Sequence, residues 1–136
     1  MQKILVSLFI RNGMYAIIIS ENGVVKDKYV KKLREPDKNK YLVMIEVFNC
    51  ALRRLKVFIQ DSMADNVVFE TSNSILMKWI EAKYSKKEYE KEFHSLMLEL
   101  DQIPICYTML FNKKPLAALY LDEKYIEKPK LSGLDL

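Results

Sequence analysis

Residues 3–31 read KILVSLFIRNGMYAIIISENGVVKDKYVK, and this stretch decides the fold. Asn-Gly pairs at 12–13 and 22–23 are typical of tight β-hairpin turns, and the residues around them are rich in β-branched and aromatic side chains. The pattern predicts three successive antiparallel strands at residues 2–10, 14–20 and 24–31. In the third strand, strict alternation puts Val25, Asp27, Tyr29 and Lys31 on one face and Val24, Lys26, Lys28 and Val30 on the other, and this mixed pattern with its lysines favours an edge position.

A long helix follows the strands. Residues 34–39 are polar and contain a proline, which predicts a loop, and either Asp37 or Asn39 can cap the helix after it. The helix is predicted over residues 41–60. Its apolar residues recur at spacings of three and four, and this periodicity places them on one face that packs across the sheet: Leu42, Ile45, Phe48, Leu52, Leu55 and Ile59.

The second half of the chain alternates strands and helices. The β-branched run at residues 66–70 predicts a fourth strand, parallel to the first because a helical crossover leads to it. Two helices at 75–82 and 87–100, a fifth strand at 105–111 and a last helix opened by Pro115 complete the order. The predicted fold class is α/β, a five-stranded mixed sheet flanked by helices in the order βββαβααβα.

Composition limits the class of protein. The 136 residues fit one domain, predicted at residues 1–127 with a tail at 128–136, and the apolar runs are much shorter than the roughly 20 residues that span a membrane. We therefore expect a cytoplasmic protein without membrane contact. With only three glycines, the sequence contains no glycine-rich loop of the kind that binds nucleotide phosphates. Cys50 and Cys106 lie in apolar segments and are predicted to be buried free thiols.

The order of elements resembles the ribonuclease H fold. Within it, ALRRLKVFI (residues 51–59) and VVFETSNSILMKWI (residues 67–80) resemble the family's first helix and the passage from its fourth strand to the next helix. Family members carry a Thr-Asp-Ser-like step at that passage. Here the step is Glu70-Thr71-Ser72-Asn73-Ser74, without an aspartate.

The resemblance implies hydrolysis of a phosphodiester by two Mg²⁺ ions held by four carboxylates, the first of them on the first strand. Residues 3–10 contain no acid, and the nearest candidates are Arg11 and Asn12. The family's His-bearing loop before the last helix is also unmatched, because FNKKP stands at residues 111–115.

The remaining acidic candidates come from three elements. Glu46 lies near the place of the family's helix carboxylate, although matching Ala51-Leu52 to the family helix puts Met44 there. Glu70 ends the fourth strand, and Asp122 resembles the acid of the last helix. These three are catalytic candidates, with Mg²⁺ as cofactor, only if the chain is a divergent nuclease acting on an RNA–DNA hybrid or a related substrate.

The leading hypothesis is instead a catalytically degenerate ribonuclease H-like binding module, with no cofactor and no committed metal ligand. The resemblance implies contact with protein or nucleic acid in replication, recombination or transcription, in a bacteriophage or another system, and the cytoplasm would be the host's for a phage protein. Four basic residues are candidates for phosphate contact, with solvated surface charge as the alternative: Arg53, Arg54, Lys113 and Lys114.

Two further interpretations concern protein partners. Leu131, Leu134 and Leu136 make the end of the chain apolar, and this tail weakly resembles the peptides by which replication proteins bind sliding clamps. Packing of the tail on its own domain is the alternative. A structural subunit that forms a homodimer through an exposed strand edge is the third hypothesis for the whole chain.

Overall fold

The structure is a computed structural model that describes residues 3–35 and 38–121. It begins with the three predicted antiparallel strands, β1 (Lys3–Arg11), β2 (Met14–Glu21) and β3 (Val24–Lys32). Both turns have the left-handed backbone that Asn-Gly favours, with φ of 51° and 74° at Asn12 and Gly13 and of 53° and 83° at Asn22 and Gly23.

Helix α1 (Lys40–Ile59) follows the loop and confirms the predicted long helix. The side chain of Asn39 caps it by accepting a hydrogen bond of 2.8 Å from the backbone N–H of Tyr41. Asp37, the other predicted cap, lies outside the described residues. Most of the predicted apolar stripe is buried in the main core, including Ile45, Phe48 and Leu52.

The rest of the chain gives β4 (Asn66–Thr71), α2 (Ser74–Ala82), the short 3₁₀ helix η1 (Lys87–Tyr89), α3 (Glu90–Asp101) and β5 (Cys106–Phe111). Residues 116–121 are helical and form the C-terminal helical segment. The five strands lie in the order β3-β2-β1-β4-β5, with β4 parallel to β1 and β5 parallel to β4. The predicted fold class, the parallel fourth strand and the edge position of β3 are therefore confirmed.

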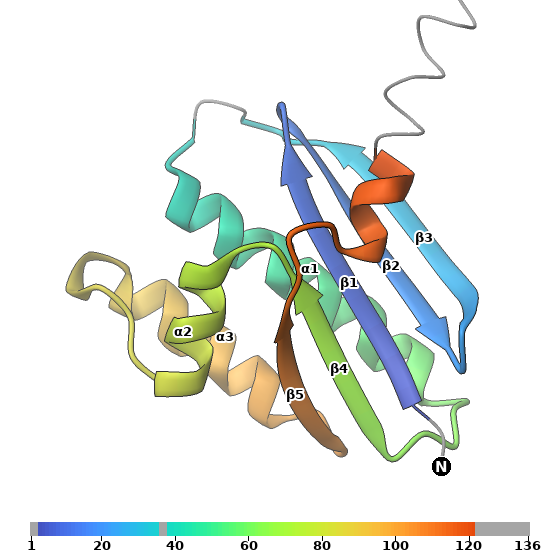
Figure 1. The fold of residues 1–136 in the computed structure, drawn as a ribbon. Coiled ribbons are helices and arrows are strands. Elements are labelled where there is room, and N and C mark those ends of the chain that lie inside the picture. Colours follow the sequence, from blue (N-terminus) through green and yellow to red (C-terminus); the bar gives the residue numbers. More distant parts are fainter. Residues whose placement is uncertain (1–2, 36–37, 122–136) are drawn as a thin grey trace, which may run out of the picture.

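Helices cover the two faces of the sheet unequally (Figure 1). Helix α1, with α2 and α3, packs on one face, where Ile4, Val6 and Leu8 of β1 enter the main core. The C-terminal helical segment lies on the opposite face, where Ala117 and Leu121 pack against β2. Alternate residues of β1 therefore face two different layers.

One expectation for β3 is wrong. Strict alternation puts Val25 on the same face as Asp27 and Tyr29, but the pairing with β2 shifts between Ile19 and Ser20, so that Asp27 pairs with Ile19 and Val25 with Ser20. The extra residue is a β-bulge, which reverses the side-chain alternation. Val25 consequently packs in the smaller core, whereas Tyr29 packs in the main one.

The predicted burial of both cysteines is also wrong. Cys50 is half-buried on α1, and Cys106 is exposed. Cys106 opens β5, which is the outer strand of the sheet, and at that edge an apolar run has neighbours on one side only. Both residues are free thiols.

Further predictions concern a membrane span and the end of the chain. No helix within residues 3–35 and 38–121 has both the length and the hydrophobicity that crossing a bilayer requires. Asp122, the domain boundary at 127 and the leucine tail lie outside the described residues and stay predictions.

Candidate functional site

Glu70 lies one residue before the end of β4, directly opposite Ser7 of β1 in the parallel ladder. Phe69 and Val67, one and three positions earlier in β4, point to the main core, so Glu70 points to the other face, where it meets the start of the C-terminal helical segment. Ser7 is fully buried, and Glu70 is 6% exposed. A buried carboxylate requires hydrogen-bond donors, and this one has them.

Both oxygens of the Glu70 carboxylate accept hydrogen bonds. Oε1 accepts from the Ser7 hydroxyl at 2.8 Å and from the backbone N–H of Leu116 at 2.7 Å, and Oε2 accepts from the side-chain amide of Asn112 at 2.9 Å. The Ser7 oxygen in turn accepts from the backbone N–H of Ala117 at 2.8 Å. We call these five residues the Glu70 network: Ser7, Glu70, Asn112, Leu116 and Ala117.

The Glu70 network caps the C-terminal helical segment. Leu116 and Ala117 are its first helical residues, and N–H groups at a helix start have no partner within the helix. Glu70 and Ser7 provide the missing acceptors, and a negative charge is favoured at this positive end of the helix dipole. The carboxylate at the end of β4 therefore holds the last segment of the fold against the sheet.

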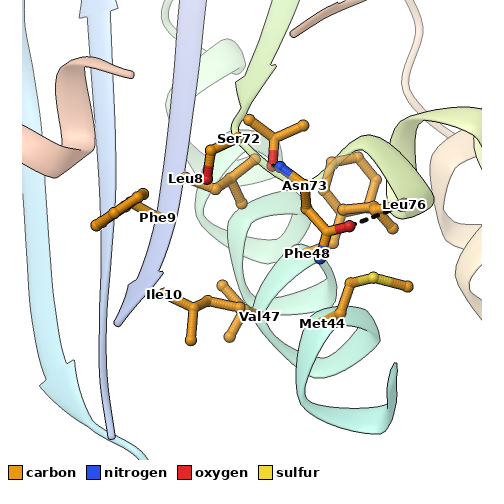
Figure 2. A pocket seen from close by; sticks show the side chains of 10 residues that line it. Leu8, Phe9, Ile10, Met44, Val47, Phe48, Ser72, Asn73 and Leu76 are labelled. Carbon is orange, nitrogen blue, oxygen red and sulfur yellow. Dashed lines mark hydrogen bonds between the residues drawn. The ribbon is translucent and has the colours of Figure 1, made fainter. Parts of the chain in front are cut away.

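A small cavity of about 70 Å³ lies on the other face, between the ends of β1 and β4 and helix α1 (Figure 2). This is the β1–β4 pocket. Its lining is apolar apart from three neutral polar residues: Leu8, Phe9, Ile10, Met44, Val47, Phe48, Thr71, Ser72, Asn73 and Leu76. Asn73 already caps α2, because its side-chain oxygen accepts from the N–H of Leu76 at 3.0 Å. None of these ten described residues carries a charge.

The residues of this region do not fit Mg²⁺, which takes oxygen ligands with net negative charge. Met44, which the helix match put in the place of the family's helix carboxylate, lines the β1–β4 pocket and is a thioether, not an acid. Residues 3–35 and 38–121 contain no group of three or more His, Cys, Asp or Glu side chains that could hold a metal ion.

Glu46 and Glu70, the two acidic candidates among the described residues, do not come together. Glu46 is exposed on α1 and bonds Nζ of Lys38 at 2.8 Å, whereas Glu70 points to the opposite face of the sheet. Asp122 lies outside the described residues.

The four basic candidates fall into two separate pairs. Arg53 is exposed on α1, and its neighbour Arg54 makes two hydrogen bonds of 2.8 Å to the carboxylate of Asp27. Lys113 and Lys114 are exposed in the loop between β5 and the C-terminal helical segment, at the end of the sheet. The fold therefore does not join these pairs into one surface.

Sequence reasoning did not identify Ser7 and Asn112 as members of a site. Ser7 is the single polar residue in the run ILVSLFI, and that was the available signal. Asn112 is a loop residue whose partner is 42 positions away in sequence. Their roles depend on strand register and on the course of the last loop, which local patterns do not specify.

Comparisons with known proteins identify the fold. No protein-family model matches the chain, and neither does any curated protein sequence. Among solved structures, ribonuclease H1 from the halophilic archaeon Halobacterium salinarum is similar, with a TM-score of 0.64 and 8% identity over 81% of this chain and 85% of that one.

Two more solved structures are similar to this chain. LC11-RNase H1, isolated from compost, has a TM-score of 0.63 and 14% identity over 90% of both chains. The same enzyme in complex with an RNA/DNA hybrid has a TM-score of 0.62 and 12% identity over 84% of this chain and 88% of that one. This chain therefore has the ribonuclease H fold.

Proposed function

We propose that this chain is a non-catalytic ribonuclease H-like binding module that contacts nucleic acid or protein during replication, recombination or transcription. The observation that carries the proposal is the Glu70 network, in which protein donors occupy both oxygens of the carboxylate at the end of β4. The uncharged β1–β4 pocket supports it. A module of this kind would act in the cytoplasm, that of a host cell if a phage encodes it.

The carboxylate of Glu70 is largely used by the protein itself. The donors of Ser7, Leu116 and Asn112 take three of its roughly four acceptor positions, so a metal ion would have to compete with them. Two-metal hydrolysis also needs further carboxylates at the same place. Glu46 is on the other side of the sheet, so among residues 3–35 and 38–121 the acidic candidates do not form the shared site that the divergent-nuclease alternative requires.

Nucleic acid is the first partner to test. LC11-RNase H1, with the same fold, was solved with an RNA/DNA hybrid. Protein contact through Leu131, Leu134 and Leu136 stays a prediction, because the tail lies outside the described residues. A homodimer through an edge strand, β3 or β5, would appear as a concentration-dependent mass in light scattering.

The decisive experiment combines calorimetry with Mg²⁺ and Mn²⁺ and a cleavage assay on a labelled RNA–DNA hybrid, with a ribonuclease H1 as positive control. We expect no metal binding at millimolar concentration and no cleavage. Metal-dependent cleavage that Asp122→Asn abolishes would overturn the proposal and establish the divergent nuclease. The variant separates cleavage by this chain from cleavage by a contaminating nuclease.

A further inference from the structure

A groove runs along the junction of β3 and α1, on the flank of α1 away from the β1–β4 pocket. It consists of two adjoining hollows of about 580 and 550 Å³ that share Tyr29, Cys50 and Arg53 in their linings. We call it the β3–α1 groove. It has only Val47 in common with the lining of the β1–β4 pocket, so the two are separate features.

The lining of the β3–α1 groove is strongly basic. Two carboxylates also line it, and each is already in an ion pair, Asp27 with Arg54 at 2.8 Å and Glu46 with Lys38 at 2.8 Å. Six cationic side chains line it: Lys26, Lys31, Lys32, Arg34, Arg53 and Arg54. The net charge of the whole chain is only +4, so positive charge is concentrated at this groove.

Arg54 is fixed in the floor of the groove. Its guanidinium bonds both oxygens of Asp27 and lies 4.0 Å from the centre of the Tyr29 ring. The hydrogen bonds to Asp27 raise the pKa of Arg54 above its ordinary value. The other five cationic side chains that line the groove are exposed, so they can reach a ligand that lies along it.

We infer that the β3–α1 groove binds the sugar-phosphate backbone of nucleic acid. The inference rests on the proposed function and names the surface that would perform it. Cationic side chains spaced along β3 and α1 suit a polymer that carries one negative charge per nucleotide. Arg54 covers a face of Tyr29, so the contact is to phosphates more than to stacked bases, and it tolerates any sequence.

Fluorescence anisotropy in EDTA tests the inference, with a single-stranded DNA oligonucleotide and an RNA–DNA hybrid as separate probes. The test variant is Lys32→Ala with Arg53→Ala, two exposed positions in the groove. The charge-matched control is Lys78→Ala with Lys91→Ala, two exposed positions on α2 and α3. Circular dichroism confirms that both variants fold.

We expect the groove variant to bind at least one probe roughly tenfold more weakly and to reduce the slope of log affinity against log salt by about 1–2. The control should keep the wild-type affinity. The probe with the larger loss identifies a single strand or a hybrid as the source of the phosphates.

Three results would overturn the inference. One is unchanged binding by the groove variant together with a loss in Lys113→Ala with Lys114→Ala, which would move the contact to the loop after β5. Another is equally tight binding of polyglutamate of matched charge, which would indicate an acidic protein partner. The third is no binding of either probe. The metal-binding and cleavage assays test the proposed lack of catalysis, and their outcome does not depend on any of these three results.

Discussion

Ser7 and Glu70 face each other across the parallel β1–β4 ladder, and the Ser7 hydroxyl donates a 2.8 Å hydrogen bond to the Glu70 carboxylate. An acid in place of Ser7 would put two carboxylates side by side, an arrangement that a bound cation would stabilise. A hydroxyl there gives the single carboxylate a donor instead, and it also accepts from Ala117. The pair therefore stabilises the fold without a metal.

Ser7→Ala should destabilise the protein by about 1–3 kcal/mol, because it removes a buried donor to Glu70 and leaves the N–H of Ala117 without its acceptor. Urea denaturation followed by circular dichroism measures the loss. Ser7→Thr keeps a hydroxyl and should lose less. Equal losses in the two variants would show that packing, not hydrogen bonding, determines the cost.

Glu70→Gln distinguishes a helix cap from a metal ligand. If Glu70 belonged to a cluster of acids that binds a metal, removing its negative charge would relieve repulsion and stabilise the metal-free protein. Here we expect a loss of about 1 kcal/mol, because an amide offers one acceptor oxygen to the donors of Ser7, Leu116 and Asn112. Glu70→Ala, which removes both acceptors, should cost roughly 3 kcal/mol. Thermal unfolding in EDTA measures both, and a stabilised Glu70→Gln protein would contradict the cap.

The ion pair between Arg54 and Asp27 should contribute about 0.5–1 kcal/mol in a double-mutant cycle of Arg54→Ala and Asp27→Ala. Its geometry is bidentate, but each side chain is about 30% exposed, so solvent screens the attraction. The coupling energy should fall when the cycle is repeated at high salt. A coupling that salt leaves unchanged would indicate packing of Arg54 on Tyr29 as its source.

Tyr15 should make the protein sensitive to alkali. Burial, followed by its interactions with Cys50 and Tyr29, raises the pKa of Tyr15 well above its ordinary value of about 10. The folded state then favours the protonated phenol, so this contribution to stability is complete below about pH 10 and declines as the pH rises above it. Absorbance at 295 nm during titration follows ionisation. Tyr15→Phe should lose less stability between pH 9 and 12 than the wild type.

Asn39→Ala should cost about 1 kcal/mol, because Asn39 caps α1 and its side-chain amide also donates to the hydroxyl of Tyr89 at 2.8 Å. Asn39→Asp keeps the cap and loses only the donor, so we expect a smaller loss. Denaturant unfolding separates the two. Equal stability of Asn39→Ala and the wild type would show that the cap is dispensable.

Most of the fold could be predicted from local signals in the sequence. Asn-Gly turns predicted both hairpins, and the spacing of apolar residues predicted α1. The exposure of Cys106 was missed because an apolar run does not reveal which strand will end as an edge. The reversal at Val25 was missed because a bulge depends on the partner strand.

The candidate site was less accessible to sequence reasoning. The absence of an acid from residues 3–10 was visible in the sequence, and the resemblance to ribonuclease H named Glu70 at the end of the fourth strand as a candidate. What Glu70 does there was not visible, because its partners come from positions 7, 112 and 116. Such a network depends on register and on loop path, and both are set by the whole chain.

The Glu70 network has a consequence for protein synthesis. The bond between Ala117 and Ser7 joins residues 110 positions apart, and Leu116 reaches Glu70 across 46. During translation, β1 and β4 leave the ribosome well before Asn112 and Leu116, so Glu70 has only Ser7 and water as donors until the last segment emerges. Nascent chains that end before residue 112 should therefore remain open to proteolysis, and the domain should become resistant only after the segment at 116–121 has docked.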